Sequence, residues 1–424
     1  MTSDNRQWIG IRRRDLLRGA AGFGAVVMAA GLKGCTPEEG SEGSSDASSA
    51  APQESGGTAA GEPVKIGLVA AITGGSALSG EAITRGLTVA IEEVNQNGGV
   101  MGGRPLELVI RDDESTPAKG VTAARELIER ENVAVVFGGI DSPVSLAMLP
   151  VFQELQTPYM GVWAAATGIT RNGNDPNYAF RVSANDNIVD RFLVKHISET
   201  YDTEKVGLVL INNPWGDSNE KGLRQWAPEY GLEIVGVEKF NNDDTDMSAQ
   251  LGRLQAAGAG ALLLVANAAP GAQMMKSLAR LNWDVPVISH WGISGGRFSE
   301  LAGADANKVV FVQTYSFYGD QGPVGEKVLS DLQAEFDLEG PSEILAPVGT
   351  ANAYDALHLV ALALDVAETT DGPQLREAFY NLPTYSGLIK TYEQPFTPED
   401  HDALDENDYI LVQWDGIEIV PIEA

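Results

Sequence analysis

The chain has 424 residues and a formal net charge of −30, with 59 acidic residues against 29 basic ones. This excess of negative charge repels nucleic acid and anionic lipid headgroups, and no basic stripe offsets it, which excludes a nucleic-acid-binding protein. The single cysteine excludes an intramolecular disulfide, and the four histidines match no metal-binding spacing, so neither a metal nor another cofactor is expected.

The first 34 residues have the pattern of a cleaved export signal. Arg13 and Arg14, in the run RRDLLR, resemble the twin-arginine export motif, and the 14-residue apolar run that follows is too short to cross a bilayer. The run leads into Leu-Lys-Gly-Cys, which resembles a lipoprotein processing box that would place a diacylglyceryl group on Cys35. Lys33 departs from that box, and plain cleavage nearby is the alternative. We expect an exported protein, held by lipid at the outer face of the cytoplasmic membrane or in the periplasm.

A tether and a folded part follow the signal. Residues 35–62 are rich in Ser, Gly and Glu and hold almost no large apolar side chain, which predicts a flexible tether. From residue 63 onward, short apolar runs alternate with longer segments of helical period, which predicts parallel sheets covered by helices. The expected strands are 64–70, 106–111, 133–137, 206–211, 232–238, 261–265, 285–289 and 309–313. A folded part of about 360 residues exceeds what one core usually serves, so we expect two lobes with a ligand cleft between them.

Glycines, carboxylates and amides recur at set intervals near the start of the folded part. The pattern comprises TGG at 73–75, Gly80, Gly86, EEVNQNGG at 92–99 and DD at 112–113. Further matching segments are 138–142, 165–167, 215–216, 246–248 and 354–357. In combination these segments resemble the branched-chain amino-acid binding proteins of ABC importers, within the type I periplasmic-binding fold.

The resemblance implies an α/β fold of two doubly wound parallel-sheet lobes, joined by three hinge crossovers, that closes on a small ligand. It assigns residues 63–182 and 319–403 to the first lobe, and residues 183–318 and 404–424 to the second. It implies a monomeric extracytoplasmic solute-binding protein that is not an enzyme. Its partners would be a small ligand and a membrane permease with separate ATPase subunits, and ligand sensing in the same fold is the alternative.

The family holds the α-carboxylate of an amino acid with a serine, a threonine and backbone N–H groups. The matching positions are Ser142 and Thr167, and Ala165 would offer its carbonyl. Ser79, in the loop after the first strand, is a further candidate. The other interpretation of Ser142 and Thr167 is that they are ordinary helix caps.

Tryptophans and a small-residue segment mark the departures from the family pattern. Many amino-acid binders of the family have an acidic residue that binds the ligand's ammonium group. Trp291 occupies or adjoins that position, and no other residue of this chain is identified as the ammonium counter-ion. Trp163 and Trp215 also fall on loops expected at the cleft, and Asn267 begins a segment of small residues where the family has an aromatic side chain. Core packing is the ordinary role of each tryptophan alone, and a cation could also be held by their ring faces. Together they predict an aromatic-lined slot.

From the predicted aromatic slot we rank three classes of ligand. An aromatic or other apolar carboxylate comes first, a branched-chain amino acid second, and a urea-like or amide-like ligand third. A serine hydrolase is the enzymatic alternative, because residues 292–296 match G-x-S-x-G with Ser294 at the centre, and Asp355 and His401 follow in hydrolase order. The motif is short, and a Gly-rich turn beside the cleft accounts for it without catalysis.

Overall fold

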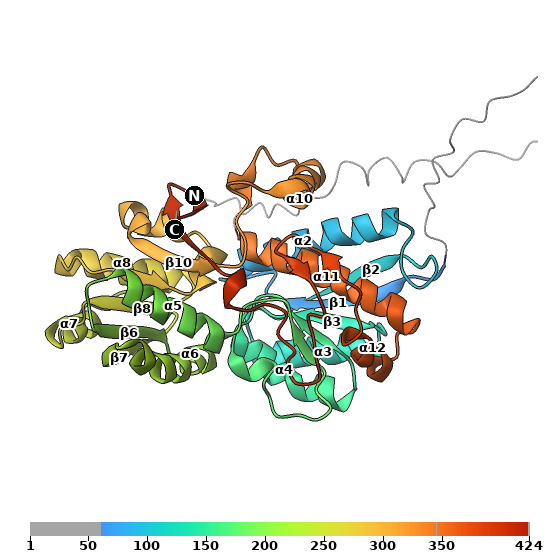
Figure 1. Cartoon of the computed structure of the whole chain (residues 1–424), viewed down its shortest axis with the longest axis horizontal. Helices are drawn as coiled ribbons and strands as arrows, with labels where there is room; N and C mark the ends of the chain where they lie inside the picture. The colour runs from blue at the N-terminus through green and yellow to red at the C-terminus, as the bar shows by residue number, and fades with distance from the viewer. Residues whose placement is uncertain (1–60, 345, 423–424) are drawn as a thin grey trace, which may run out of the picture. The chain divides into compact units, whose positions relative to one another are not determined.

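The computed structural model describes residues 61–344 and 346–422, which form two helix-covered sheets (Figure 1). The first sheet is parallel throughout, in the order β2-β1-β3-β4-β5. Its strands are β1 Val64–Ala70, β2 Leu106–Asp112, β3 Val135–Gly138, β4 Tyr159–Gly161 and β5 Ala179–Arg181. The helices of this lobe are α2 Ala77–Gln96, α3 Pro117–Glu129, α4 Ser142–Glu154, α10 Gly322–Phe336, α11 Pro347–Ala367 and α12 Gly372–Phe379. The short strands β11 Tyr385–Ser386 and β12 Thr391–Tyr392 pair with each other.

The second sheet has the order β14-β13-β10-β9-β8-β6-β7. Its parallel strands are β6 Lys205–Ile211, β7 Glu233–Phe240, β8 Ala261–Val265, β9 Val287–Ser289 and β10 Val309–Gln313. Two antiparallel strands, β13 Ile410–Asp415 and β14 Glu418–Pro421, complete one edge. Its helices are α5 Asp186–Thr200, α6 Pro214–Trp226, α7 Ser248–Ala256, α8 Ala268–Leu281 and α9 Phe298–Ala302.

All eight strands expected from the sequence are present, and the two-lobe α/β fold is confirmed. Strands β1 and β8 are almost completely buried because helices cover both faces of a central parallel strand. Strands β4 and β5 were not expected, since three residues are too few to display a hydrophobic period. The antiparallel pair β13 and β14 was also missed, so the second sheet is parallel only in part.

Helix α2 packs closely along α11, and a glycine permits the approach. A Cβ atom on Gly86 would lie 2.2 Å from the carbonyl oxygen of Thr350 in α11. Helix α11 is buried over most of its length because it is covered by α2 and α12. The main hydrophobic cluster continues from this helix pair into the second sheet, so the two lobes share one core.

The chain passes between the sheets in three connectors, 182–185, 314–321 and 393–409. Arg181, the last residue of β5, forms a buried ion pair with the third connector, in which its Nη2 lies 2.7 Å from Asp402 Oδ1. The Asn185 side-chain amide donates to the other oxygen of Asp402 at 2.7 Å. Arg181 Nη1 donates to the carbonyls of Ala164 and Ala166, so the same guanidinium fixes the loop after β4. The lobe boundaries given above, at single-residue detail, stay a prediction.

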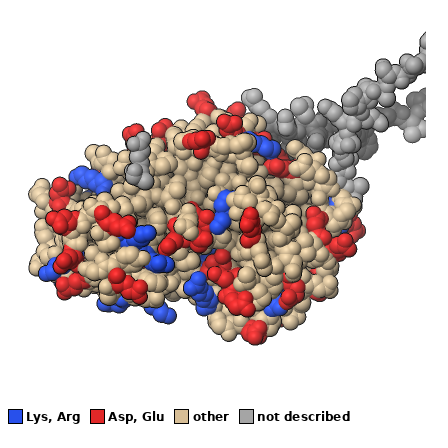
Figure 2. Space-filling model, viewed as in Figure 1, with Lys and Arg blue, Asp and Glu red and all other residues tan. Residues whose placement is uncertain are grey.

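Acidic side chains are spread over the face of the molecule shown in Figure 2, with basic ones interspersed. Within the described residues, no helix combines the length and the apolar content that a bilayer crossing requires. The twin-arginine pair Arg13 and Arg14, the lipidation candidate Cys35 and nearly all of the tether lie outside the described residues and stay predictions.

Candidate ligand-binding site

Four helices begin at one cavity between the lobes. The N-cap residues of α2 and α4 are Ser76 and Asp141, and those of α6 and α8 are Asn213 and Asn267. All four residues line the cavity. The N-terminus of a helix carries free N–H groups and a partial positive charge, so this convergence favours negatively charged or hydrogen-bond-accepting groups.

We call this cavity the polar cleft. It encloses about 930 Å³ of space, open solvent included, which suits a small ligand. It is lined by Gly75, Ser76, Ser79, Ser115, Asp141, Pro143, Asn213, Asn242, Asn267, Ala268, Ala269, Pro270, Gly292 and Gly295. Six of these fourteen residues have a hydroxyl or amide side chain, seven are glycine, alanine or proline, and the lining holds neither an aromatic nor a large aliphatic side chain. Asp141 is the one charged residue in the lining of the polar cleft.

The carboxylate of Asp141 does not cap its own helix. An aspartate at an N-cap usually accepts hydrogen bonds from backbone N–H groups of the first turn, but Asp141 makes no such bond. Burial raises its pKa, and the facing side chains of Ser115, Asn267 and Ser76 oppose that rise. Its Oδ2 atom is buried and has no hydrogen-bond partner among the described residues. Asp141 therefore belongs to the lining of the cleft and keeps one carboxylate oxygen without a hydrogen bond from the described residues.

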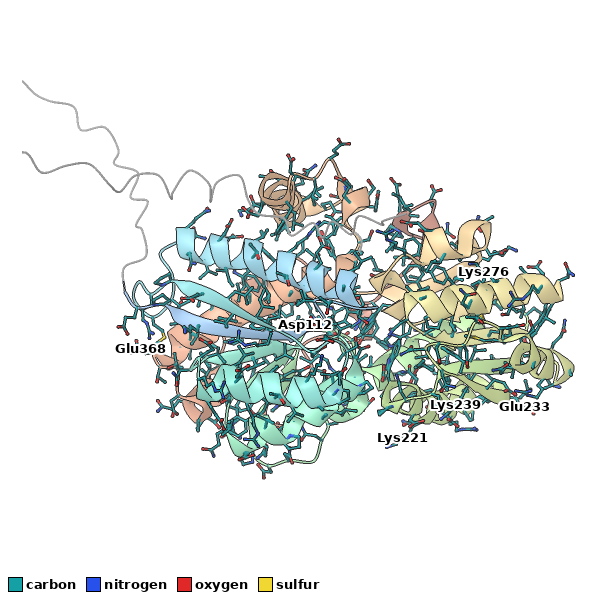
Figure 3. All side chains as sticks on the ribbon, turned by 180° about the vertical axis from the view of Figure 1, so that it is seen from behind. Asp112, Lys221, Glu233, Lys239, Lys276 and Glu368 are labelled. Atoms are coloured by element: carbon teal, nitrogen blue, oxygen red, sulfur yellow. The ribbon has the colours of Figure 1, made fainter. Side chains whose placement is uncertain are left out.

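Two further carboxylates support this edge of the first lobe. Asp112, labelled in Figure 3 at the end of β2, accepts hydrogen bonds from the Thr73 hydroxyl at 2.6 Å and the Ile72 N–H at 3.0 Å, which ties down the loop leading to α2. Asp113 is buried and accepts from the Ser115 N–H at 2.7 Å. Burial raises the pKa of Asp113 to about 6, and the charge of Asp141 adds to the rise.

A second, smaller cavity adjoins the polar cleft, and we call it the tryptophan slot. It encloses about 280 Å³, open solvent included. It is lined by Ile140, Asp141, Ser142, Pro143, Trp163, Ala164, Ala165, Asn213, Trp215, Asn267 and Trp291. The structure thus brings together six of the residues predicted from the sequence: Ser142, Trp163, Ala165, Trp215, Asn267 and Trp291.

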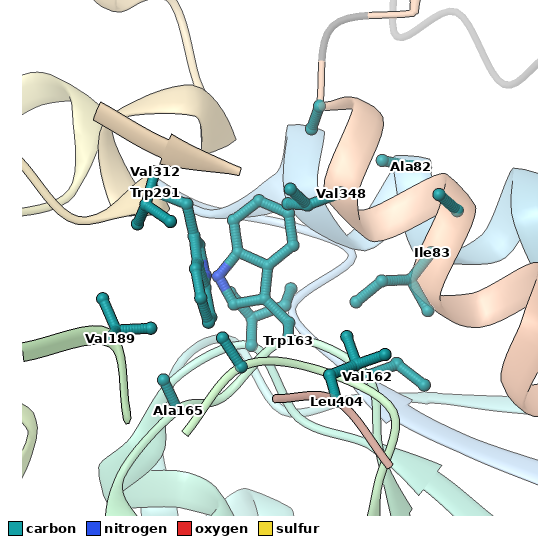
Figure 4. Close-up of a cluster of buried hydrophobic side chains, with 14 of the residues drawn as sticks. Ala82, Ile83, Val162, Trp163, Ala165, Val189, Trp291, Val312, Val348 and Leu404 are labelled. Atoms are coloured by element: carbon teal, nitrogen blue, oxygen red, sulfur yellow. The ribbon is translucent and has the colours of Figure 1, made fainter. Parts of the chain in front are cut away.

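The three tryptophans of the slot are packed as core residues. Their exposed fractions are 4% for Trp163, 8% for Trp215 and 1% for Trp291. Trp163 and Trp291 belong to the buried cluster shown in Figure 4, among aliphatic side chains of both lobes. The Trp215 indole N–H donates to Asp186 at 3.2 Å, and a Cβ on Gly292 would lie 2.5 Å from its ring. Protein atoms therefore occupy most of the space that an aromatic ligand would need.

The groups predicted to hold a carboxylate already have partners within the protein. The Ser142 hydroxyl accepts from the Ala166 N–H at 3.2 Å, and the Ala165 carbonyl accepts from the Asp186 N–H at 2.8 Å. Thr167 lies outside the lining of both cavities, and its hydroxyl bonds to Asn185 and Asn187 at the start of α5. A ligand carboxylate at this position would have to displace these bonds.

Ser79 and Asn267, also predicted from the sequence, line the polar cleft. Sequence reasoning missed the other polar residues of this cavity, namely Ser76, Ser115, Asp141, Asn213 and Asn242. A signal was available, because most of these residues follow the carboxyl ends of strands that the sequence did predict. In parallel sheets those ends meet at the cleft.

The hydrolase alternative is wrong in its geometry. Ser294 is fully buried, and its hydroxyl donates to the Trp291 carbonyl at 2.7 Å. Both ring nitrogens of His401 are engaged elsewhere, one with the Tyr380 hydroxyl and the other with the Ala179 carbonyl. Asp355 accepts from two backbone N–H groups and the Tyr392 hydroxyl. No catalytic arrangement joins the three residues.

Known proteins resemble this chain over most of its length. The Leu/Ile/Val-binding protein homolog 3 of Brucella melitensis is 22% identical over 85% of this chain and 94% of its own. The leucine-, isoleucine-, valine-, threonine- and alanine-binding protein of Pseudomonas aeruginosa is 23% identical over 84% of this chain and 91% of its own.

Solved structures share the fold. A periplasmic binding protein type 1 from Bordetella pertussis superposes with a TM-score of 0.78 at 22% identity, covering 85% of this chain and all of the other. A solute-binding protein from Rhodopseudomonas palustris in complex with benzoate has a TM-score of 0.72 at 21% identity, over 85% of this chain and 95% of its own. The family model described as periplasmic binding protein matches residues 63–417. The chain therefore belongs to the periplasmic binding protein family, which consists of solute-binding proteins rather than enzymes.

Proposed function

We propose that this protein is the extracytoplasmic solute-binding subunit of an ABC importer and that it captures its solute in the polar cleft. The observation that carries the proposal is the convergence of four helix N-termini, two from each lobe, on one cavity. A solute bound there contacts both lobes at once, so its binding energy favours the arrangement in which the lobes are close together. A permease that recognises this arrangement would receive loaded protein in preference to empty protein.

The relatives narrow the class of solute. One is named for binding leucine, isoleucine and valine, another for binding these three with threonine and alanine, and one solved structure of the fold contains benzoate. The polar lining fits a small solute with several hydrogen-bonding groups better than a bulky apolar one. We therefore place a small amino acid or amine ahead of the aromatic carboxylate and branched-chain amino acid that the tryptophans suggested, and a urea-like or amide-like solute stays the alternative.

Export and anchoring complete the proposal. A twin-arginine signal would carry the folded protein across the membrane, and a lipid on Cys35 would hold it beside the permease. The separate ATPase subunits would supply the energy for transport. Mutation of Cys35 to serine should release the protein from the membrane fraction without altering its affinity for solute.

The test is a binding screen on the purified protein. A specific solute at a hundred times its dissociation constant should stabilise the folded state by about 2.7 kcal/mol, which raises the melting temperature by a few degrees. The screen covers amino acids, amines, amides and aromatic acids, and calorimetry gives the affinity of each hit. Absence of a hit in all four classes would contradict solute capture.

A further inference from the structure

The lining of the polar cleft carries one negatively charged side chain. Asp141 is its one charged residue, and the buried Oδ2 atom of this carboxylate lacks a partner among the described residues. The three side chains that face the carboxylate, Ser76, Ser115 and Asn267, come from three different loops and two lobes. A carboxylate in the lining of a cavity, with one oxygen that no described residue bonds, can accept a further hydrogen bond from a ligand.

Two further carboxylates, Asp112 and Asp113, strengthen the preference of the cleft for a positively charged group. Asp113 and Asp112 follow one another at the end of β2, and the charges of Asp141 and Asp112 both act on Asp113. The lining of the polar cleft offers no lysine, arginine or histidine to neutralise this charge. A ligand whose only charge is a carboxylate would bring another negative charge beside Asp141, and repulsion between like charges would weaken its binding.

A metal ion is not the cation that this geometry fits. Within the described part of the chain, no three His, Cys, Asp or Glu side chains gather as a metal-binding group. A protonated amine requires fewer ligands, because its N–H groups donate to one carboxylate and to neighbouring hydroxyl and amide oxygens. Ser115 and Asn267 provide such oxygens next to Asp141.

We infer that Asp141 is the counter-ion for a protonated amine of the solute, and that the protein selects amine-bearing solutes against carboxylates that have no amine. The inference rests on the proposed function and names the solute class for the same cleft. It also accounts for the loss of the family's acidic residue at Trp291, since the negative charge comes from the N-cap of α4 instead. The N-termini of α2, α6 and α8 remain available for the carboxylate of an amino acid.

The experiment compares three kinds of probe by calorimetry. L-Alanine and L-leucine carry an amine and a carboxylate, ethanolamine and putrescine carry only amines, and benzoate and isobutyrate carry only a carboxylate. Each probe is titrated into the wild-type protein, into Asp141→Asn and into Asp202→Asn. The second substitution removes the same charge from an exposed site outside the cleft, so it controls for the overall charge.

Binding of at least one amine-bearing probe to the wild type, and at least tenfold weaker binding to Asp141→Asn, is the expected result. Asp202→Asn should bind like the wild type. Binding of benzoate or isobutyrate, with equal or greater affinity for Asp141→Asn, would overturn the inference while solute capture would stand. Failure of every amine-bearing probe would also overturn the inference, and the wider solute screen would then decide separately whether the protein captures any solute.

A second measurement uses the wild-type protein alone. The amine needs the ionised form of Asp141, so its affinity should fall as the pH is lowered and this carboxylate takes up a proton. The charge of Asp141 acts on the carboxyl of Asp113, which also loses its charge in mildly acidic solution. The pH dependence should therefore persist in Asp113→Asn and disappear in Asp141→Asn. An affinity that rises on acidification would overturn the inference.

Discussion

The tryptophan slot and the polar cleft adjoin each other and share Asp141, Pro143, Asn213 and Asn267, yet their contents differ. The slot encloses about 280 Å³ against about 930 Å³ for the cleft, and indole rings and internal hydrogen bonds occupy its surroundings. The cleft is lined by short polar side chains that leave the space open. Residue types that suit a ligand thus mark a binding region, but only packing determines which part of that region is free.

The two cavities differ in the role that we expect of each. The slot joins the lobes, because its tryptophans pack against both and its loop is fixed by Arg181. The cleft is the cavity proposed for the solute, and one acceptor in its lining, Asp141 Oδ2, has no hydrogen-bond partner among the described residues. Substitutions in the slot should therefore lower stability, whereas substitutions in the cleft should lower affinity.

Removal of an indole from the slot should have the largest effect. Trp291→Ala deletes a side chain with 1% exposure and leaves a cavity, and such changes lower the free energy of unfolding by about 3–5 kcal/mol. Urea denaturation measures the loss, and Trp226→Ala, at a half-buried site, should lose less. An unchanged stability with abolished binding would mean that the slot, and not the cleft, receives the solute.

The next largest effect is on stability, depends on pH and comes from Asp113, which feels the charge of the cleft residue Asp141. Burial raises the pKa of Asp113 to about 6, whereas this group titrates near pH 4 in the unfolded chain. The folded state therefore holds the proton more tightly, and the stability that this contributes is lost as the pH rises from about 4 to about 6. The loss is on the order of 2–3 kcal/mol.

Melting temperatures between pH 4 and pH 7 test this expectation. Asp355, whose pKa burial also raises to about 6, should contribute a change of the same sign. Asp113→Asn should flatten its share of the pH dependence. A curve for Asp113→Asn that is as steep as the wild type would show that Asp113 stays charged in the folded protein.

Filling the polar cleft should separate affinity from stability. Ala269 is exposed in the first turn of α8 and lines the cleft, so Ala269→Trp would place an indole in the space of the solute. We expect at least a tenfold loss of affinity, or about 1.4 kcal/mol, with little change in stability. Ala256→Trp, at an exposed position in α7, should retain full affinity. Retained affinity in Ala269→Trp would place the solute elsewhere.

The smallest effect is expected where the lobes touch. The Ser79 hydroxyl donates to the Gly295 carbonyl at 3.0 Å across the lobes, and Ser79→Ala removes this bond at a cost of about 1 kcal/mol. The change should favour separated lobes, which small-angle scattering measures as a larger radius of gyration. Thr84→Ala removes a similar bond within α2 and should not affect lobe separation. An equal response in both variants would contradict the role given to Ser79.

The sequence was sufficient for the fold wherever strands are long and apolar. Strands β1, β6 and β8 are runs of buried residues, and each was predicted within one residue of its observed bounds. Strands β4 and β5 have three residues each, so their pairing depends on neighbours that no local pattern reveals. The antiparallel edge at β13 and β14 depends on pairing with β10, which lies about a hundred residues earlier in the chain.

The site was predictable by region but not in detail. Six predicted residues gather at the tryptophan slot because family spacing locates strand ends reliably. Asp141 was missed because the acidic partner of an amine was sought only near Trp291. Whether an N-cap side chain bonds to its own helix or turns into a cavity depends on the facing lobe. The sequence around Asp141 does not contain that information.

The acidic exterior affects how quickly a solute arrives. A net charge of −30, with acidic side chains spread over the face shown in Figure 2, creates a negative potential that extends roughly 10 Å into a solution of moderate ionic strength. A cationic solute is drawn towards such a surface and an anionic solute is slowed, before either contacts the cleft. Added salt screens this field, so it should reduce the association rate of cations and increase that of anions. The surface thus acts as a kinetic filter that favours cations, as the Asp141 carboxylate does.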